Sequence, residues 1–560
     1  MKVRVEKQIG ANVLSIETGE LAKQAGGSCL VQYGETVVFC AATRDKPREG
    51  IDFFPLTCDY RERTAAAGKF PGGFLKREGR PTTKETLSAR LIDRPIRPMF
   101  ADGFKDEVQV CASVLASDRE HDGDVLAMTG GVAAVMLSGM PFEGPLGSVR
   151  LAQVDGEFVV FPTQDQLEMS DLDMIVSGTK ESVLMIEGFA REMPEARMME
   201  AIKAAHRHIQ DVCDLQMELV EKVGVEKMAY EPPAHDDLYD QLKAKYYEDF
   251  KAAKQTPGKH ERAEAVSSLK QRALAETIPN PDADDAICAN RFSNLWHDLE
   301  GRVLRDLILA GTRADGRTAT ALRDIECRVN VLPRVHGSAV FQRGETQALV
   351  TVTLGTGRDE QRVDGLFDEY SKKFMLDYNF PSYSVGECRP IRGPGRREIG
   401  HGALAERSVF PVMPDIDNFP YTVRVISDIM ESNGSSSMAS VCGATLGLMS
   451  AGVPITNPVA GISVGLVQEP DQWLLLTDII GDEDHFCDMD FKIAGTQNGI
   501  TGIQLDLKLK GISYEIIEAT LAQSREARIE ILRNMLTAVP RPAEDISPYA
   551  PRLFRTNIHP

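Results

Sequence analysis

Short segments of alternating apolar and polar positions occur in two separate parts of the chain. Residues 27–43 read GSCLVQYGETVVFCAAT and residues 337–353 read GSAVFQRGETQALVTVT, and both contain β-type runs. In each part a glycine- and alanine-rich apolar helix pattern follows, then further strands and a closing amphipathic helix. Because strands and helices are mixed in this order, the pattern predicts an α+β fold.

The two parts are also similar to each other in sequence. Seven of the 17 positions in these segments are identical, including the Gly-Glu-Thr of both. Further matching blocks follow at an offset between 310 and 317; they are 91–99 with 404–413, 130–141 with 442–454, and 171–179 with 488–496. Two long copies indicate one ancestral domain that was duplicated, rather than a solenoid.

The segment between the copies has helical apolar spacing throughout, interrupted by PGK and IPNPDADD. It predicts an all-helical linker domain. After Val539 the chain has five prolines in 21 residues and no apolar periodicity, which is typical of an extended tail. The expected domains are therefore the first copy at 1–211, the linker domain at 212–310, the second copy at 311–539 and the tail at 540–560.

Composition narrows the class of protein. The 560 residues carry 63 basic and 83 acidic side chains, a net charge of −20, so a polyanionic partner needs local basic patches, backbone N–H groups or metal ions. The 42% hydrophobic fraction excludes a disordered chain. Ten scattered cysteines without a C-x-x-C pair, and a charged start without an apolar run, predict a cytoplasmic protein with no signal peptide and no membrane partner.

An acidic cluster in the second copy is the strongest chemical signal. Asp482, Asp484, Asp488 and Asp490 lie within nine positions, and Lys492 follows. If 488–492 is a strand, its period of two puts alternate charged residues on one face. Carboxylates so close repel each other unless a cation neutralises them, and Mg²⁺ held by carboxylates and a substrate phosphate is the natural one. The alternative is a solvated acidic turn.

The first copy provides an internal control for this cluster. It keeps Asp171 and Asp173, but Leu167 stands in place of Asp484 and Ile175 in place of Lys492. A catalytic cluster is therefore expected in the second copy only.

A serine-rich segment precedes the apolar helix of the second copy. Ser435, Ser436 and Ser437 belong to SNGSSSMASVCGATLGLM, residues 432–449. Free N–H groups at a helix start, aided by the helix dipole, bind anions. Simple capping is the alternative, but it needs one serine only. The first copy has the acidic SDREHDGD at 117–124, which would repel phosphate.

Two basic segments suggest contacts with a polyanion. Residues 393–407 read GPGRREIGHGALAER, where the adjacent Arg396 and Arg397 suit phosphate recognition and His401 is either a substrate contact or a structural histidine. At these positions the first copy has Thr83, Lys84 and Ser88. Its own glycine-rich loop, GKFPGGFLKREGRP at 68–81, suits stacking and phosphate contacts with single-stranded nucleic acid, or is an exposed basic loop.

Taken together, GETQALVTVTLGT, RREIGHG, FPYTVRV, ESNGSSSMASVCGA and GDEDHFCDMDFK closely resemble the bacterial polynucleotide phosphorylase family, over essentially the whole chain. The resemblance implies two ribonuclease-PH-like domains joined by a helical domain and assembled as a homotrimeric ring around a channel. It implies 3′-to-5′ phosphorolysis of single-stranded RNA in messenger RNA turnover, with release of nucleoside diphosphates, and the reverse polymerisation. It further implies Mg²⁺, with Mn²⁺ as the alternative, inorganic phosphate as co-substrate, and an RNA-degrading assembly with an endoribonuclease and a helicase.

The resemblance also assigns roles to residues. Asp484, Asp490 and Lys492 form the metal and catalytic group, and Ser435, Ser436 and Ser437 hold phosphate. Arg396, Arg397 and His401 surround the reacting end of the RNA. The expected RNA-binding residues are Phe74, Lys76, Arg77, Arg80, Arg90 and Arg94. The family typically has a second aromatic residue and an arginine where this chain has Leu75 and Lys76, so weaker stacking is expected there.

Family members usually continue into a KH domain and an OB-type domain, and this chain stops at Pro560, about where those begin. A naturally short form or a trimmed core is therefore expected. Two other functions compete with phosphorolysis. A hydrolytic metal-dependent 3′ exoribonuclease would need no phosphate site, which the serine segment disfavours. A catalytically inactive RNA-binding ring subunit is disfavoured by the intact Asp484, Asp490 and Lys492.

Overall fold

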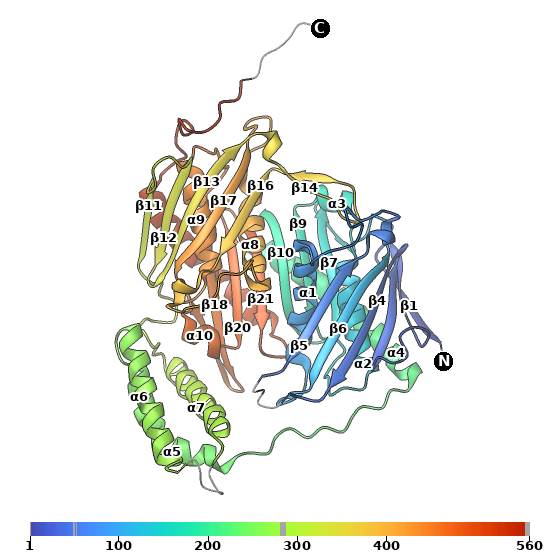
Figure 1. Cartoon of the computed structure of the whole chain (residues 1–560), viewed down its shortest axis with the longest axis vertical. Helices are drawn as coiled ribbons and strands as arrows, with labels where there is room; N and C mark the ends of the chain where they lie inside the picture. Colours follow the sequence, from blue (N-terminus) through green and yellow to red (C-terminus); the bar gives the residue numbers. More distant parts are fainter. Residues whose placement is uncertain (1, 49–50, 52, 281–286, 555–560) are drawn as a thin grey trace.

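The computed structural model describes residues 2–48, 51, 53–280 and 287–554. Each copy begins with a sheet of its own (Figure 1), and the strand order of the two sheets is the same apart from one extra edge strand in the first. In sheet order, the first contains β1 (Val3–Ile9), β2 (Asn12–Thr18), β3 (Gly27–Tyr33), β4 (Thr36–Asp45), β6 (Glu107–Ala116) and β5 (Leu56–Glu62). The second contains β11 (Ile325–Val329), β12 (Gly337–Arg343), β13 (Thr346–Gly355), β17 (Thr422–Glu431) and β16 (Phe374–Asn379).

The repeated Gly-Glu-Thr forms the same hairpin turn in both sheets. Gly34 and Gly344 have φ values of +58° and +53°, a left-handed conformation that glycine adopts at little cost. The threonine hydroxyl then donates a hydrogen bond to a carbonyl of the loop before the central apolar helix of its copy: Thr36 to His121, and Thr346 to Gly434. The turn therefore ties the hairpin to the loop that begins the central helix of each copy.

A third sheet joins the copies. Its eight strands, in order, are β19 (Gln472–Thr477), β18 (Ala460–Glu469), β20 (Met489–Gly495), β21 (Ile500–Leu507), β10 (Val183–Met193), β9 (Leu172–Gly178), β7 (Gly147–Val154) and β8 (Glu157–Val160). The order is symmetric about the antiparallel pair β10–β21, where the two copies meet. The duplicated α+β fold expected from the sequence is therefore confirmed.

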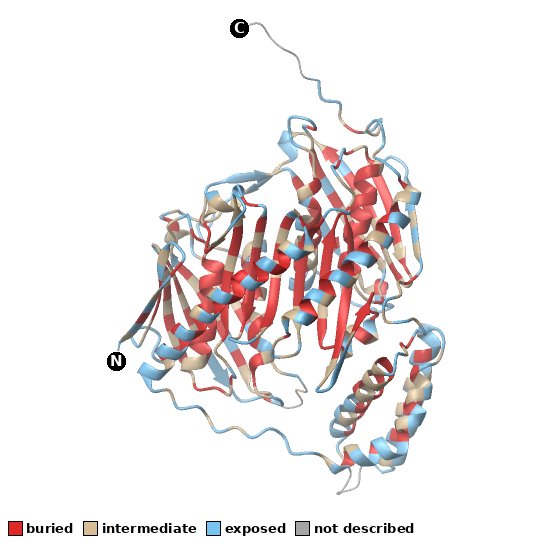
Figure 2. Cartoon of the chain, turned by 180° about the vertical axis from the view of Figure 1, so that it is seen from behind, coloured by how far each residue is buried: buried red, intermediate tan, exposed pale blue. Residues whose placement is uncertain are grey.

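Helices fill the space between the sheets, and they too occur in matching pairs. They are α1 (Thr83–Ile96) with α8 (Arg396–Val409), α2 (Gly123–Leu137) with α9 (Ser436–Ser450), α3 (Gln164–Glu168) with α10 (Gly481–Phe486), and α4 (Glu195–Val223) with α11 (Tyr514–Ala538). α2 and α9 are buried on nearly all sides, which explains their uninterrupted apolar sequence. Figure 2 shows buried residues along the strands and on the inner faces of the helices, while the outer helix faces carry exposed residues.

The linker is helical, as expected, and has its own core. It consists of α5 (Asp237–Lys254), α6 (Lys259–Thr277) and α7 (Ala289–Leu309), packed around Phe250 and Trp296. The end of α7 leaves this core: Leu304 and Ile308 are buried against Leu476 and Ile479 of the second copy. The helical domain is thereby attached next to α10.

One expected boundary is wrong. Residues 212–223 were assigned to the linker by their helical spacing, but they are the end of α4 and belong to the first copy. Leu215 and Leu219 are fully buried in its core, so the helix continues without a break. An extended segment, 224–236, then leads to α5 (Figure 1).

The tail after Val539 is extended, as expected, but residues 540–554 are not detached from the second copy. The backbone N–H of Ala543 donates to the carbonyl of Met449, and Ala550 is buried in the second copy's core. Residues 555–560 lie outside the described part of the chain. Within the described residues, no helix is both long and apolar enough to cross a membrane.

Candidate active site

A cavity of about 450 Å³ opens where the second copy meets α1 of the first. Its lining residues come from α1 (Arg90), α8 (Arg397, His401), α10 and the turn after it (Gly481, Asp484, His485, Asp488), β20 (Met489, Asp490, Lys492) and β21 with its end (Asp506, Leu507, Lys508). Five of the residues expected at the catalytic site from the sequence are therefore together. Arg90, expected to bind RNA, joins them across the junction of the copies.

The four clustered carboxylates separate into two kinds. Asp482 pairs with Lys254 of α5 at 3.3 Å, and Asp488 pairs with Arg305 of α7 at 2.7 Å. Both of these cations come from the helical domain. Asp484 and Asp490 line the cavity, and no cation among the described residues of the helical domain pairs with either of them. These two carboxylates are therefore available for chemistry.

Asp490 is held from both sides along the sheet. Lys492 lies two residues further on β20 and places its Nζ 2.5 Å from the Asp490 carboxylate, as the period of a strand requires. The hydroxyl of Ser463, on the neighbouring β18, donates to the other oxygen. Burial lowers the pKa of Lys492, but Asp490 and Asp506 outweigh it and raise that pKa, so the ammonium is charged.

Asp484 completes the acidic pair from α10. Burial and the nearby Asp490 raise the pKa of Asp484 above its ordinary value. Two carboxylates that disfavour each other's charge are stabilised by a cation between them. No group of three or more His, Cys, Asp or Glu residues in the described part of the chain is placed to hold a metal ion. A pair of carboxylates suits Mg²⁺, which commonly takes one or two carboxylates and completes its coordination with substrate phosphates and water.

His401 is a neutral histidine among cations. Burial, with smaller contributions from Lys492, Arg397 and Arg90, lowers its pKa well below the ordinary value. Its buried Nδ1 has no hydrogen-bond partner among the described residues. The ring lies edge-on to Tyr378, with the ring centroids 5.1 Å apart. His401 is therefore a hydrogen-bonding group that adds no charge to the site.

The serine-rich segment borders this cavity. The side chain of Asn433, two residues before Ser435, accepts a hydrogen bond from the backbone N–H of Gly481 in the cavity wall. The hydroxyl of Ser436 lies 2.6 Å from that of Tyr378, the residue that contacts His401. The three serines are not among the residues that line the cavity, but their segment is joined to the cavity wall through Asn433 and Gly481, and to His401 through Tyr378.

None of the three serines caps α9 with its side chain, so the capping interpretation fails. Ser435 stands at the N-cap in a left-handed conformation, with φ of 49°. The hydroxyls of Ser435 and Ser437 are buried and have no hydrogen-bond partner among the described residues. Buried hydroxyls are rarely left unpaired, so two of them at a helix start indicate a site for an anion.

A buried ionic network fixes the conformation of this loop. Asp478 is fully buried, 2.7 Å from the guanidinium groups of both Arg323 and Arg343. Burial opposes its ionisation, yet the two arginines hold the pKa of Asp478 well below its ordinary value. Arg323 also donates to the carbonyl of Asn433, and Arg343 to that of Ser435. The arginines therefore hold the backbone that presents the serines.

Two expected site residues make other contacts. Arg396 turns away from the cavity and donates to Asp59 and to the carbonyl of Cys58 in the first copy. Arg94 is 12% exposed and pairs with Glu187 and Asp506. The guanidinium of Arg94 is buried and already paired with two carboxylates, so it is not free to contact RNA. Its role is to orient Asp506, which lines the cavity.

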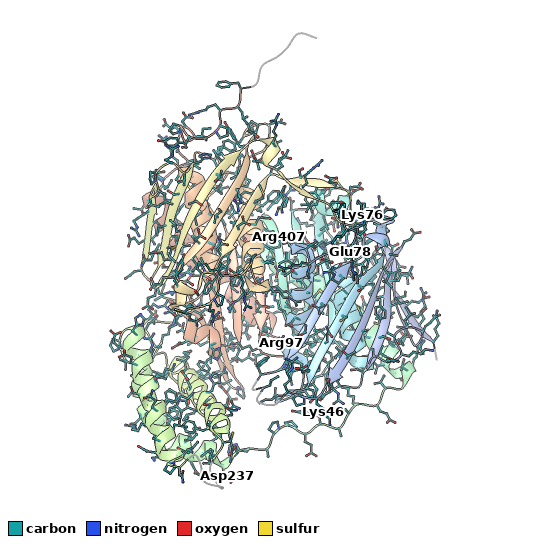
Figure 3. The ribbon with its side chains drawn as sticks, viewed as in Figure 1. Lys46, Lys76, Glu78, Arg97, Asp237 and Arg407 are labelled. Carbon is teal, nitrogen blue, oxygen red and sulfur yellow. The ribbon has the colours of Figure 1, made fainter. Side chains whose placement is uncertain are left out.

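The loop 68–81 lies on the first copy and does not line the cavity. Phe74 is 99% exposed. Figure 3 labels Lys76 and Glu78 on the first copy and Arg407 on α8 of the second copy. Arg77 and Arg80 are likewise exposed. The loop is therefore accessible to a long polymer at the surface but is not part of the cavity wall.

Sequence reasoning missed Asp506, on β21, and Lys508, directly after it. Lys508 donates to the carbonyls of Asp484 and His485 and so holds the end of α10. Their signal was present: from Gln504 onward, QLDLKLK alternates polar and apolar residues at the end of an apolar strand. Of the polar residues in that alternation, Asp506 and Lys508 line the cavity.

Family comparisons agree with this geometry. The 3′ exoribonuclease family, domain 1, matches twice, at residues 13–141 and 321–454, and domain 2 of that family matches 144–208. The double match confirms the duplication and defines the class as ribonuclease-PH-like. The polyribonucleotide nucleotidyltransferase RNA binding domain matches residues 237–318, the helical linker.

Curated relatives match along the whole chain. The polyribonucleotide nucleotidyltransferase of Rhodopirellula baltica is 70% identical over 560 residues, which are 100% of this chain and 74% of that protein. The enzymes of the same name from Rhodospirillum centenum and Sorangium cellulosum are 49% and 47% identical, over 99% and 100% of this chain and 78% and 74% of theirs. The chain belongs to the polyribonucleotide nucleotidyltransferase family.

Proposed function

We propose that this chain is a phosphorolytic 3′-to-5′ exoribonuclease, acting in messenger RNA turnover, that also works in reverse as a template-independent RNA polymerase. It transfers the terminal nucleotide of single-stranded RNA to inorganic phosphate and releases a nucleoside diphosphate. The observation that carries the proposal is the pair of buried hydroxyls at the start of α9, Ser435 and Ser437, which have no hydrogen-bond partner among the described residues. A hydrolase needs water there, not a second anion site.

The chain's own residues hold two anions in position. The hydroxyls of Ser435 and Ser437 and the N–H groups of α9 bind inorganic phosphate. One oxygen of hydrogen phosphate attacks the phosphorus of the last phosphodiester, and the bond from that phosphorus to the 3′ oxygen breaks. The shortened RNA keeps this oxygen, and the proton of hydrogen phosphate ends on it as the new 3′ hydroxyl. Lys492 and Arg397 offset the negative charge of the five-coordinate transition state. His401 donates a hydrogen bond to a phosphate oxygen without adding a charge.

Asp484 and Asp490 hold Mg²⁺, or Mn²⁺ as the alternative, in this proposal. When bound, the cation supplies charge neutralisation for the two approaching phosphates. The support is the donor chemistry, two hard carboxylate oxygens. Burial, and after it the charge of Asp490, raises the pKa of Asp484, and a cation would relieve both effects.

The same proposal extends to assembly and context. We infer a homotrimer in the cytoplasm, in which single-stranded RNA passes the loops of the first copies before it reaches the cavity. Arg77, Arg80 and Phe74 contact the RNA, and an endoribonuclease and a helicase are partners in RNA degradation. Exposed apolar side chains on the loop of the first copy support such contacts.

The test is digestion of a 3′-labelled RNA with and without inorganic phosphate, with the products separated as diphosphates and monophosphates. Phosphate-dependent diphosphates are expected. Monophosphates formed without phosphate would establish the hydrolytic alternative. RNA binding without either product would establish an inactive ring subunit.

A further inference from the structure

Two histidines face each other at the rim of the cavity, from different domains. His297 is on α7 of the helical domain, and His485 is on α10 of the second copy. Their Nε2 atoms are 3.3 Å apart, and their ring centroids are 5.0 Å apart. Both side chains are exposed, so solutes reach them.

Phe486 buttresses both rings. It contacts His297 with centroids 5.0 Å apart and His485 with centroids 4.8 Å apart. Gly301, one turn after His297 on α7, makes room for it: a Cβ at that position would lie 3.0 Å from the Phe486 ring. The imidazoles are thus held in place by packing and not by their mutual contact alone.

The spacing of the two nitrogens fits a tetrahedral metal. Zinc–imidazole bonds are about 2.0–2.1 Å long, and two such bonds at a tetrahedral angle separate the nitrogens by about 3.3 Å. We propose that His297 and His485 bind a transition-metal dication of the zinc type, with water in the remaining coordination positions.

The ligand chemistry sets this site apart from the carboxylate pair. The nearby carboxylates of Asp482 and Glu300 are paired with Lys254, at 3.3 Å and 2.6 Å, so the two imidazoles are the ligands that this rim offers. Imidazole nitrogens select Zn²⁺, Ni²⁺ or Cu²⁺, whereas carboxylates suit Mg²⁺. The two sites therefore take different ions.

Binding here has a consequence for the active site. A metal bridge would join α7 to α10, and α10 carries Asp484 next to His485. Fixing α10 restrains a carboxylate that the proposed reaction uses. Zinc is therefore expected to slow turnover, and this second step of the inference depends on the proposed function, whereas binding does not.

Binding is tested by calorimetric titration of the full chain with Zn²⁺, in excess Mg²⁺ to occupy the carboxylates. The variant is His297→Gln, which does not line the cavity, and the matched control is His208→Gln, a half-exposed histidine on α4. Wild type and the control should bind one Zn²⁺ more tightly than His297→Gln does, by on the order of tenfold or more. Equal titration curves for wild type and His297→Gln would overturn the site, whatever else binds zinc in the chain.

Turnover gives an independent readout. With Mg²⁺ alone, His297→Gln should be as active as wild type; added Zn²⁺ should inhibit wild type and the control more strongly than His297→Gln. If zinc inhibits all three equally while calorimetry still separates them, the site exists but its coupling to Asp484 is wrong. If no protein has activity with Mg²⁺, the proposed function fails and the calorimetric result stands.

Discussion

The starts of the two central helices, α2 and α9, have the same fold but opposite chemistry. In the second copy, the buried hydroxyls of Ser435 and Ser437 have no hydrogen-bond partner in the described part of the chain. Asp122 and Asp124 occupy the matching positions of the first copy, and the side chain of Asp122 caps α2. Lys84 lies 3.0 Å from Asp122, at the position that matches Arg397. In the first copy, aspartate side chains therefore occupy the helix start, whereas in the second copy the matching position can bind an external anion.

The residues that support the loops before α2 and α9 differ between the copies in the same way. Arg343 and Asp478 of the second copy form an ion pair, and the matching Tyr33 and Phe161 of the first form an aromatic pair with centroids 4.8 Å apart. Asp478 and Phe161 share a left-handed backbone, with φ of 57° and 50°. The backbone geometry has thus been kept while the ionic contacts that fix the serine loop were replaced by apolar packing. Duplication leaves the fold intact and removes chemistry from one copy.

The largest expected effect comes from one substitution at two matching positions. Asp490→Ala should reduce phosphorolysis and polymerisation by roughly 10³-fold or more, because it removes a carboxylate of the metal pair. Asp173→Ala should leave both activities near normal, because its carboxylate only pairs with Arg150, 2.7 Å away. It should instead lower stability, by about 1–2 kcal/mol after discounting for partial exposure.

Activity assays in both directions and thermal melts measure these effects. Near-normal turnover of Asp490→Ala at saturating Mg²⁺ would show that the metal assignment is wrong. Inactivity of a folded Asp173→Ala would show that the first copy is not chemically silent.

Exchanging the chemistry of the two helix starts should have the next largest effect. Ser437→Asp introduces the first copy's carboxylate into the phosphate site, and like charges in contact cost several kcal/mol, so phosphorolysis should fall about 10²-fold or more. The KM for phosphate should rise far more than that for RNA. The reverse change, Asp124→Ser, should leave turnover unchanged.

Ser437→Ala provides the milder version, since it removes one hydrogen bond and should raise the KM for phosphate roughly tenfold. Ser436→Ala should act mainly on stability, because that hydroxyl already has Tyr378 as its partner. Equal losses of phosphate and RNA affinity in Ser437→Ala would contradict the separation of the two binding sites.

The comparison of the two copies also shows which features of the site the sequence could predict. The two copies and the acidic cluster were predictable from strand and helix periodicity and from the internal repeat, because such patterns depend on local geometry. The sequence could not separate Asp484 and Asp490 from Asp482 and Asp488, since the cations that neutralise the latter two come from a different domain. Nor could it find that Arg94 is buried between Glu187 and Asp506, a contact across the junction of the copies.

The acidic helix start of the first copy should give a pH dependence that the serine start lacks. Burial and Asp122 raise the pKa of Asp124 to about 6. With an unfolded value near 3.9, the folded state binds more protons between these pH values, so the free energy of unfolding should fall as pH rises from about 4 to about 6. Asp124→Asn should remove this slope and raise the melting temperature at pH 7 by about 2–4 °C.

Melting curves between pH 4 and pH 8 test this, with Ser437→Ala as the matched control. The control should keep the wild-type slope, because no carboxylate stands there. An unchanged slope in Asp124→Asn would assign the dependence to other groups.

The smallest effect, confined to long RNA, is expected from the loops that precede α1 and α8. Lys76 and Arg77 lie in the first copy's loop, and Arg389 and Arg392 lie in the shorter loop of the second copy. If three chains bring their first-copy loops to one axis, modest contacts act together through a high effective concentration. Lys76→Ala with Arg77→Ala should then weaken binding of long single strands severalfold and flatten its salt dependence, because fewer counterions are released. Cleavage of oligonucleotides too short to reach from the loop to Asp490 should barely change.

Arg389→Ala with Arg392→Ala removes the same charge from the other loop and separates position from charge. If the two double variants weaken long-strand binding equally, overall charge and not the first-copy loop retains the polymer. If Lys76→Ala with Arg77→Ala slows short and long substrates by the same factor, that loop belongs to the active site or to assembly, and the division of labour between the copies is wrong.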